Sequence, residues 1–224
     1  MEKSTSVHTF VDASNDAYGV ASYLRCEFDQ GITVSIIVSK RNVAHLKPMT
    51  TPRLELMAAI LGLNLTLSII ESLSIPIADE HFWSDSMHVS YWICGGGRQF
   101  PPFVANRIGE IQRQSSPERR HYIKSVENSA NVCSSGLRAR SLLESQIWWN
   151  GSQFLLKAEN DCCERRLWNQ FNWCRKRASG VDELDHSQIQ DQTASKGVKW
   201  SFDSPLAPHF GGVHEVMIKS PKNA

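Results

Sequence analysis

The chain has 224 residues, of which 24 are Lys or Arg and 23 are Asp or Glu, giving a net charge of +1. This length suits one domain of ordinary size with an extension, or two small domains. The hydrophobic share of 41% is that of a globular protein, which excludes a wholly disordered or fibrous chain. Because the net charge gives no general attraction for phosphates, a nucleic-acid function would have to rest on local charge.

The first three predicted elements are short strands joined by tight turns, at residues 8–12, 18–25 and 32–39. Thr51 and Pro52 then predict the start of a helix. Residues 54–73 form the most apolar stretch, but they carry Glu55 and Glu71 and place apolar side chains at helical spacing. We therefore expect a core helix here rather than a membrane span.

The remaining predicted elements are strands at 80–84 and 120–123, helices at 86–94 and 103–114, and a helical turn at 128–134. The order βββ-α-β-α-α-β-α predicts an α/β fold with a mixed sheet and helices packed on it. Residues 142–156 contain Trp148 and Trp149 and are expected to pack back on this domain. Beyond residue 160 the sequence has little periodicity, which is typical of a linker or a loosely ordered segment.

The first residues contain no apolar leader, so we expect a cytoplasmic or nuclear protein that is not secreted. The six cysteines are scattered and form no C-x-x-C pair, a pattern that argues against a structural zinc site. Without export, the thiols are expected to be reduced.

Three carboxylates stand at the start or end of predicted elements. Asp12 and Asp85 each follow an apolar strand, and Glu55 lies in the first turn of the long helix. If those strands are neighbours, both aspartates reach the sheet edge where α/β proteins bind ligands, and the helix start can bring in Glu55. Gathered carboxylates repel each other unless a divalent cation neutralises them, and oxygen ligands select Mg²⁺ or Mn²⁺. Two such ions can activate a water for phosphodiester cleavage. Taken singly, each acid is more simply explained as a solvated loop end or a helix cap.

The sequence also resembles a known family. The blocks that carry the likeness are F-V-D-A-S with A-Y-G (10–19), T-P-R-L-E-L with A-A (51–59), W-S-D-S (83–86), F-V-A-N-R with E-I (103–111) and I-W-W-N-G (147–151). In order and spacing they resemble the ribonuclease H region of Bel/Pao-type retrotransposon polyproteins, over residues 8 to about 156. The resemblance implies a ribonuclease H-like fold, a five-stranded mixed sheet flanked by helices. It also implies metal-dependent cleavage of the RNA strand of RNA–DNA hybrids, with Asp12 bridging two Mg²⁺ ions and Glu55 and Asp85 completing their ligands.

The fourth acid of that family is replaced in this chain. The family motif N-P-A-D-L-A-S-R-G corresponds to residues 128–136, which read N-S-A-N-V-C-S-S-G. Asn131 therefore stands where the family has an aspartate, and the site loses one of four negative charges. In related nucleases this acid helps to hold the ion that activates the attacking water. The resemblance therefore predicts weak or absent hydrolysis, with hybrid binding partly kept.

A second resemblance covers about 30 residues near the C-terminus. Residues 191–200 and 205–212, followed by Glu215, look like the end of the integrase core of the same elements. Glu215 falls at the third catalytic acid of the integrase. The other two acids have no counterpart, so no strand transfer is expected, and an internal deletion in a retroelement copy explains the arrangement. The expected organisation is a ribonuclease H-like domain at 6–156, a linker at 157–197 and a truncated, partly disordered integrase remnant at 198–224.

Local charge differs from the balance of the whole chain. Between residues 98 and 124, six basic side chains stand against Glu110 and Glu118, an excess suited to phosphate contacts. The six are Arg98, Arg107, Arg113, Arg119, Arg120 and Lys124. A hybrid would be recognised by shape and 2′-hydroxyl contacts rather than by sequence.

Three functions stay open at this point. The first is a metal-dependent ribonuclease, with other parts of a retroelement polyprotein as partners and no membrane partner. The second is a catalytically dead nucleic-acid-binding remnant on the same fold. The third is a phosphate-binding, ATPase-like domain of similar topology, which is disfavoured because no glycine-rich phosphate loop follows the first strand.

Overall fold

The computed structural model describes residues 2–44, 49–73, 75–94 and 100–157. Arg98, the integrase-like remnant with Glu215, and all but the first residue of the expected linker lie outside the described residues. The domain boundaries proposed from the sequence therefore stay predictions.

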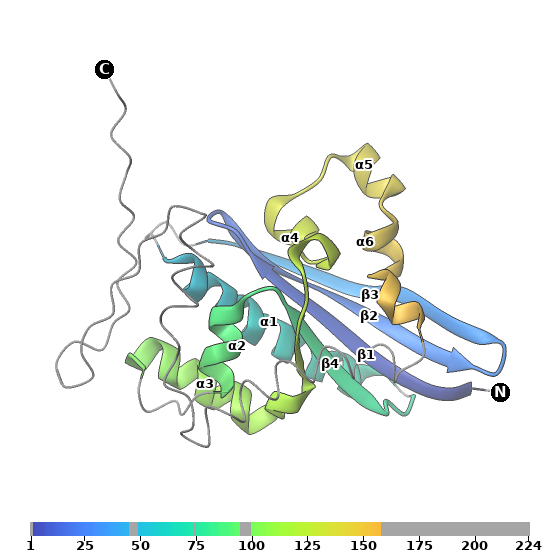
Figure 1. Cartoon of the computed structure of the whole chain (residues 1–224), viewed down its shortest axis with the longest axis horizontal. Coiled ribbons are helices and arrows are strands. Elements are labelled where there is room, and N and C mark those ends of the chain that lie inside the picture. Colours follow the sequence, from blue (N-terminus) through green and yellow to red (C-terminus); the bar gives the residue numbers. More distant parts are fainter. Residues whose placement is uncertain (1, 45–48, 74, 95–99, 158–224) are drawn as a thin grey trace, which may run out of the picture. The chain divides into compact units, whose positions relative to one another are not determined.

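Five strands form one mixed sheet in the order β3-β2-β1-β4-β5 (Figure 1). β1 (Glu2–Ala13), β2 (Ala17–Phe28) and β3 (Gly31–Val43) form an antiparallel meander. β4 (Asp79–Ser84) pairs in parallel with β1, and β5 (Arg120–Tyr122) pairs in parallel with β4. The predicted five-stranded mixed sheet is confirmed. The first three strands are longer than the apolar pattern indicated, because backbone pairing continues through their polar ends.

Three helices cover one face of this sheet: α1 (Thr51–Ser72), α2 (Met87–Cys94) and α3 (Pro102–Gln114) (Figure 1). α1 packs on β1 and β2 and approaches them closely at Gly62, where an added Cβ would lie 2.6 Å from Val11 Cγ1. By length and apolar composition α1 is able to cross a membrane. However, its side chains Leu54, Leu56 and Leu63 are buried in this packing, as expected for a core helix.

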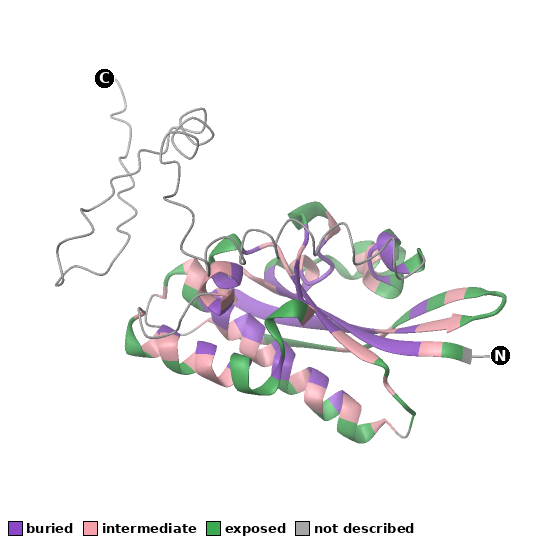
Figure 2. Ribbon diagram, turned by 60° about the horizontal axis from the view of Figure 1, so that its bottom comes forward, coloured by how far each residue is buried: buried purple, intermediate pink, exposed green. Residues whose placement is uncertain are grey.

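The opposite face is covered by the C-terminal part of the domain. It consists of α4 (Asn131–Ser135), α5 (Ala139–Glu144), α6 (Gln146–Asn150) and the 3₁₀ turns η3 (Ser125–Glu127) and η4 (Gln153–Leu156), with η2 (Pro117–Arg119) preceding β5. Phe154 and Leu155 are buried against Phe10 and Trp83. The predicted return of residues 142–156 onto the domain is thus confirmed, and apolar clusters pack on both faces of the sheet. Figure 2 shows buried residues along the central strands and in turns of the helices that pack on them.

Two side chains of β2 hold this C-terminal part. The Tyr23 hydroxyl donates to the carbonyl of Trp148 at 2.8 Å, and Arg25 donates to the carbonyls of Leu155 and Lys157, each at 3.0 Å.

Among the described cysteines, Cys94 is disulfide-bonded, which corrects the expectation of reduced thiols. Cys26 and Cys133 are free.

Candidate active site

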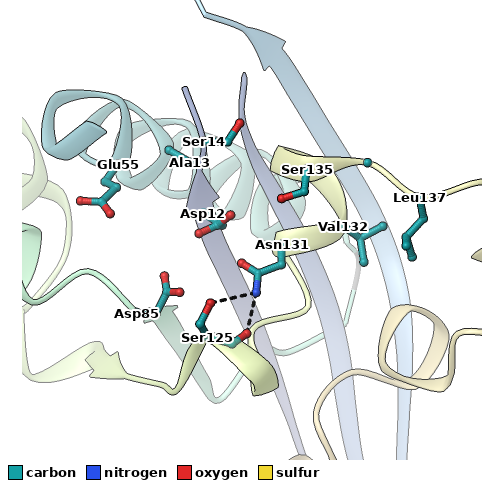
Figure 3. Close-up of a pocket in the computed structure, with 11 residues that line it drawn as sticks. Asp12, Ala13, Ser14, Glu55, Asp85, Ser125, Asn131, Val132, Ser135 and Leu137 are labelled. Atoms are coloured by element: carbon teal, nitrogen blue, oxygen red, sulfur yellow. Dashed lines mark hydrogen bonds between the residues drawn. The ribbon is translucent and has the colours of Figure 1, made fainter. Parts of the chain in front are cut away.

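The fold brings the three predicted acids to one pocket. β1 and β4 are parallel neighbours with Val11 opposite Ser84, so the next residues along, Asp12 and Asp85, lie at the same sheet edge. α1 begins at Thr51, so Glu55 lies just after its first turn, one residue later than the sequence predicted, and it still reaches the pocket. An open pocket of about 490 Å³ is lined by Asp12, Glu55, Asp85, Ser125, Asn131 and Ser135, among others (Figure 3).

Burial shapes the ionisation of two of these acids. Burial raises the pKa of Asp12 to about 6, the Ser134 hydrogen bond lowers it in part, and the charge of Asp85 raises it. Burial also raises the pKa of Glu55, against a lowering by its hydrogen bond from Ser86. Carboxylates whose pKa values are raised by burial inside one pocket are typical of functional sites.

Each acid accepts a hydrogen bond from one buried, neutral side chain that the sequence analysis did not single out. Ser134 Oγ donates to Asp12 Oδ2. Ser86 Oγ donates to Glu55 Oε2 at 2.5 Å, and Asn128 Nδ2 donates to Asp85 Oδ1 at 3.2 Å. The three donors are no more than 4% exposed. Because they are neutral, they orient the carboxylates without cancelling the negative charge of the pocket.

These donors are themselves fixed by other elements. Ser86 Oγ accepts from Val89 N and so caps the start of α2. Asn128 Nδ2 also donates to the carbonyl of Val11 at 3.0 Å. Ser134 belongs to α4, whose chain is held to the end of β1 by the Ser14 hydroxyl. All three donors lie in segments that the resemblance already covered, residues 83–86 and 128–136, but their contacts with the acids depend on the tertiary fold.

Asn131 lines the same pocket, and its side-chain amide is hydrogen-bonded to Ser125. Its Nδ2 donates to the carbonyl of Ser125 at 2.6 Å and is 3.1 Å from Ser125 Oγ. These bonds fix the orientation of the amide, so that Oδ1 is the atom left for a ligand (Figure 3). A neutral amide oxygen is a weaker ligand for a hard cation than a carboxylate.

The chemistry of the donor set fits a hard divalent cation, since it consists of carboxylate, hydroxyl and amide oxygens. In the described part of the chain, however, no three His, Cys, Asp or Glu side chains are already grouped closely enough to hold a metal ion. A bound cation would therefore have to draw the carboxylates of Asp12, Glu55 and Asp85 toward itself.

The predicted basic residues differ in how deeply the structure buries them. Arg120 is only 8% exposed, lies over the Phe82 ring and donates to Ser115 Oγ at 3.0 Å, and burial lowers its pKa to about 9. Its assignment to a nucleic-acid surface was wrong, because a buried guanidinium cannot reach a phosphate. Arg119 is half-buried and forms an ion pair with Asp79. This pairing leaves its guanidinium less free to bind a phosphate.

The other predicted basic residues differ in exposure. Arg113 and Lys124 are exposed, as predicted for phosphate contacts. Arg107 is half-buried against α1 and Phe103. The nucleic-acid contacts of these three residues stay predictions.

In the comparison with known proteins, a family model matches the first part of the chain. Residues 1–86 match the model of the Pao retrotransposon-like RNaseH-like domain. Together with the sheet order, this match confirms the ribonuclease H-like fold and the Pao-type resemblance. The integrase resemblance is not confirmed, and no curated protein matches the sequence.

The solved structures that the chain matches include three RNase H proteins. The N-terminal RNase H domain of Rv2228c from Mycobacterium tuberculosis is 15% identical, with a TM-score of 0.42, covering 63% of this chain and 100% of that one. LC11-RNase H1 in complex with an RNA/DNA hybrid is 13% identical, with a TM-score of 0.39, covering 62% and 99%. RNase H1 from Halobacterium salinarum NRC-1 is 12% identical, with a TM-score of 0.38, covering 64% and 100%.

Proposed function

From the match of its first 86 residues to a Pao retrotransposon-like RNaseH-like domain, we propose that this protein is a metal-dependent ribonuclease of retroelement origin. It would hydrolyse the RNA strand of RNA–DNA hybrids, with activity reduced by Asn131. The observation that carries the proposal is the meeting of Asp12, Glu55 and Asp85, from three different elements, in one open pocket. We further propose that it acts in the cytoplasm or nucleus, beside other parts of a retroelement polyprotein.

The proposed ligands are Asp12, Glu55 and Asp85, for Mg²⁺ or Mn²⁺. A divalent cation there would supply Lewis-acid stabilisation of the phosphodiester and lower the pKa of an attacking water. Ser134, Ser86 and Asn128 each donate to one carboxylate and so set its direction. Asn131 offers Oδ1, a neutral acceptor that can orient a water but is a weak base.

A catalytically dead nucleic-acid-binding remnant is the second candidate. The observation that favours it is the pair of hydrogen bonds from Asn131 Nδ2 to Ser125, which holds the amide to the η3 turn. An aspartate at 131 would place a carboxylate oxygen against the Ser125 carbonyl, and two acceptor oxygens repel each other. The η3 turn therefore suits the amide of asparagine better than a carboxylate.

The test is cleavage of an RNA–DNA hybrid by the full chain, by Asp12→Asn and by Asn131→Asp, in Mg²⁺ and in Mn²⁺. We expect slow cleavage by the wild type, none by Asp12→Asn, and faster cleavage by Asn131→Asp. Full Mg²⁺ activity in the wild type would show that Asn131 does not limit the reaction. Hybrid binding without cleavage under any of these conditions would instead identify the remnant.

Metal titration by calorimetry tests the ligand assignment independently of cleavage. The wild type should bind the cation, and Asp12→Asn should lose this binding. If Asp12→Asn binds Mg²⁺ as the wild type does, the assignment of the site is wrong.

A further inference from the structure

Ser125 is an exposed serine of the η3 turn that lines the acidic pocket beside the substituted position 131. Asn131 Nδ2 lies 2.6 Å from the carbonyl oxygen of Ser125 and 3.1 Å from Ser125 Oγ. Because a carbonyl oxygen only accepts hydrogen bonds, the Asn131 atom beside it must be the amide nitrogen. That nitrogen only donates, so Ser125 Oγ is the acceptor in this contact and its hydroxyl proton points elsewhere.

The backbone of the η3 turn holds this hydroxyl at a fixed place beside the acids. Asn128 N donates to the carbonyl of Ser125 at 3.0 Å. The side chain of the same asparagine donates to Asp85 Oδ1 at 3.2 Å and to the carbonyl of Val11 at 3.0 Å. Asn128 is only 2% exposed, so one buried residue joins the turn to Asp85 and to the end of β1. Figure 3 shows Ser125 between Asp85 and Asn131.

The hydroxyl proton of Ser125 is available to a ligand in the pocket. The lining residues include three carboxylates and neither Lys nor Arg. The other lining hydroxyls have partners in the protein, since Ser14 Oγ donates to the carbonyls of Ala17 and Ser134, and Ser135 Oγ lies 3.5 Å from Ser134 Oγ. Among the residues that the structure describes, the Ser125 hydroxyl proton has no acceptor. A phosphodiester that enters the pocket would supply one.

We propose that Ser125 Oγ donates its proton to a non-bridging oxygen of the scissile phosphodiester, with Asn131 as the positioning residue that keeps the hydroxyl turned to donate. This inference rests on the proposed function. A hydrogen bond to a charged acceptor is stronger than one between neutral groups, and the bond from Asn131 Nδ2 polarises the Ser125 hydroxyl further. An aspartate at position 131 would itself accept the Ser125 proton. The amide therefore gives the pocket a substrate contact that an acid at the same position would remove.

The first test is cleavage of an RNA–DNA hybrid by the full chain in Mn²⁺. The variants are Ser125→Ala and Ser125→Thr, each made in the wild type and in Asn131→Asp. Ser39→Ala is the matched control, since Ser39 is an exposed serine of β3 that lies outside the pocket lining.

Ser125→Ala should lower kcat/KM about tenfold or more, the usual effect of losing a hydrogen bond to a charged group. Ser125→Thr keeps the hydroxyl and should stay within about threefold of the wild type, as should Ser39→Ala. In Asn131→Asp, the loss on Ser125→Ala should be clearly smaller, because the hydroxyl there donates to the aspartate. Equal rates for Ser125→Ala and Ser39→Ala would overturn the proposal. An equal loss in the two backgrounds would also overturn it, because the hydroxyl would then act without Asn131.

Hybrid binding in EDTA, measured by fluorescence anisotropy, separates this inference from the proposed function. Ser125→Ala should bind the hybrid about threefold or more weakly than the wild type and Ser39→Ala do. If the wild type cleaves, and Ser125→Ala cleaves and binds equally well, the inference falls and the proposed function stands. If the wild type binds but never cleaves, the nuclease proposal falls, and the Ser125 contact stands only if Ser125→Ala binds more weakly. Absence of hybrid binding by the wild type would overturn both.

Discussion

At the scale of single residues, the carboxylates of the acidic pocket accept hydrogen bonds from neutral side chains. Asp12 accepts from Ser134, and its pKa of about 6 is raised by burial and by Asp85. In the absence of a cation, the folded protein therefore binds a proton at Asp12 more tightly than the unfolded chain does. Ionisation of this residue opposes folding as the pH rises from about 4 through 6, so the site is less stable than it would be with a neutral side chain.

Asp12→Asn should accordingly stabilise the metal-free protein. The gain should be near zero at pH 4 and reach about 1–2 kcal/mol above pH 7, a figure reduced from the full shift because the carboxyl is partly exposed. Urea unfolding in EDTA at both pH values measures it. Equal stability of the two proteins at pH 8 would contradict the raised pKa of Asp12.

Ser134→Ala should act in the opposite direction at the same carboxylate. It removes a buried donor to a charged acceptor, so the free energy of unfolding at pH 8 should fall by about 1.5–3 kcal/mol. Ser135→Ala is the matched control, because Ser135 is exposed and should change stability by less than about 0.5 kcal/mol. Similar losses in both variants, measured by urea unfolding, would show that the Ser134 contact with Asp12 has no special weight.

At the scale of elements, the C-terminal turns complete the sheet. The meander leaves one face of β1 and β2 uncovered by α1–α3, and η4 covers it with Phe154 and Leu155. Arg25 and Tyr23 bind the backbone of this segment from the sheet. The buried core of the described domain therefore includes Phe154 and Leu155 of η4.

Two adjacent leucines test this role of η4. Leu155 is completely buried, so Leu155→Ala should cost about 2–5 kcal/mol of stability. Leu156 is 50% exposed, and Leu156→Ala should cost less than about 0.5 kcal/mol. Urea unfolding at neutral pH compares them. Equal small losses would mean that η4 does not contribute to the core.

At the scale of the whole domain, three histidines run across the centre of the sheet. His8, His81 and His121 lie on β1, β4 and β5, with His81 Nδ1 3.0 Å from His121 Nε2 and the rings of His8 and His81 stacked. Burial lowers the pKa of His8 well below its usual value and that of His81 to about 4, and Arg25 adds to both effects. Folding therefore requires neutral histidines in the core.

This cluster should make the domain sensitive to acid. Because the folded pKa values are lowered, stability is fully present above about pH 6.5 and is lost as the pH falls toward 4, by about 2 kcal/mol or more. Asp12 titrates in the opposite direction over part of this range, so the measurement is best made in Asp12→Asn. An unfolding free energy that does not fall between pH 6.5 and 4 would contradict the neutral cluster.

Local sequence patterns were sufficient to predict the strands, the start of α1 and the placement of the acidic residues. Alternating apolar runs predicted the strands, and Thr51-Pro52 predicted the first turn of α1. The position of Asp12 and Asp85 after apolar strands predicted their meeting, because parallel neighbours end at the same edge. By contrast, the sequence predicted Arg120 to be a surface charge, because a basic residue in a three-residue strand gives no local signal of burial.

The sequence by itself determined the order of the main elements, the positions of Asp12 and Asp85 after apolar strands and the substitution at position 131, because each depends on residues close in the chain or on the family motif. Only the tertiary structure decided which polar groups face one another. It buried Arg120 over Phe82 and brought Ser86, Asn128 and Ser134 into hydrogen-bond contact with the acids. These contacts join residues far apart in the chain, and their existence depends on how helices and turns pack against the sheet.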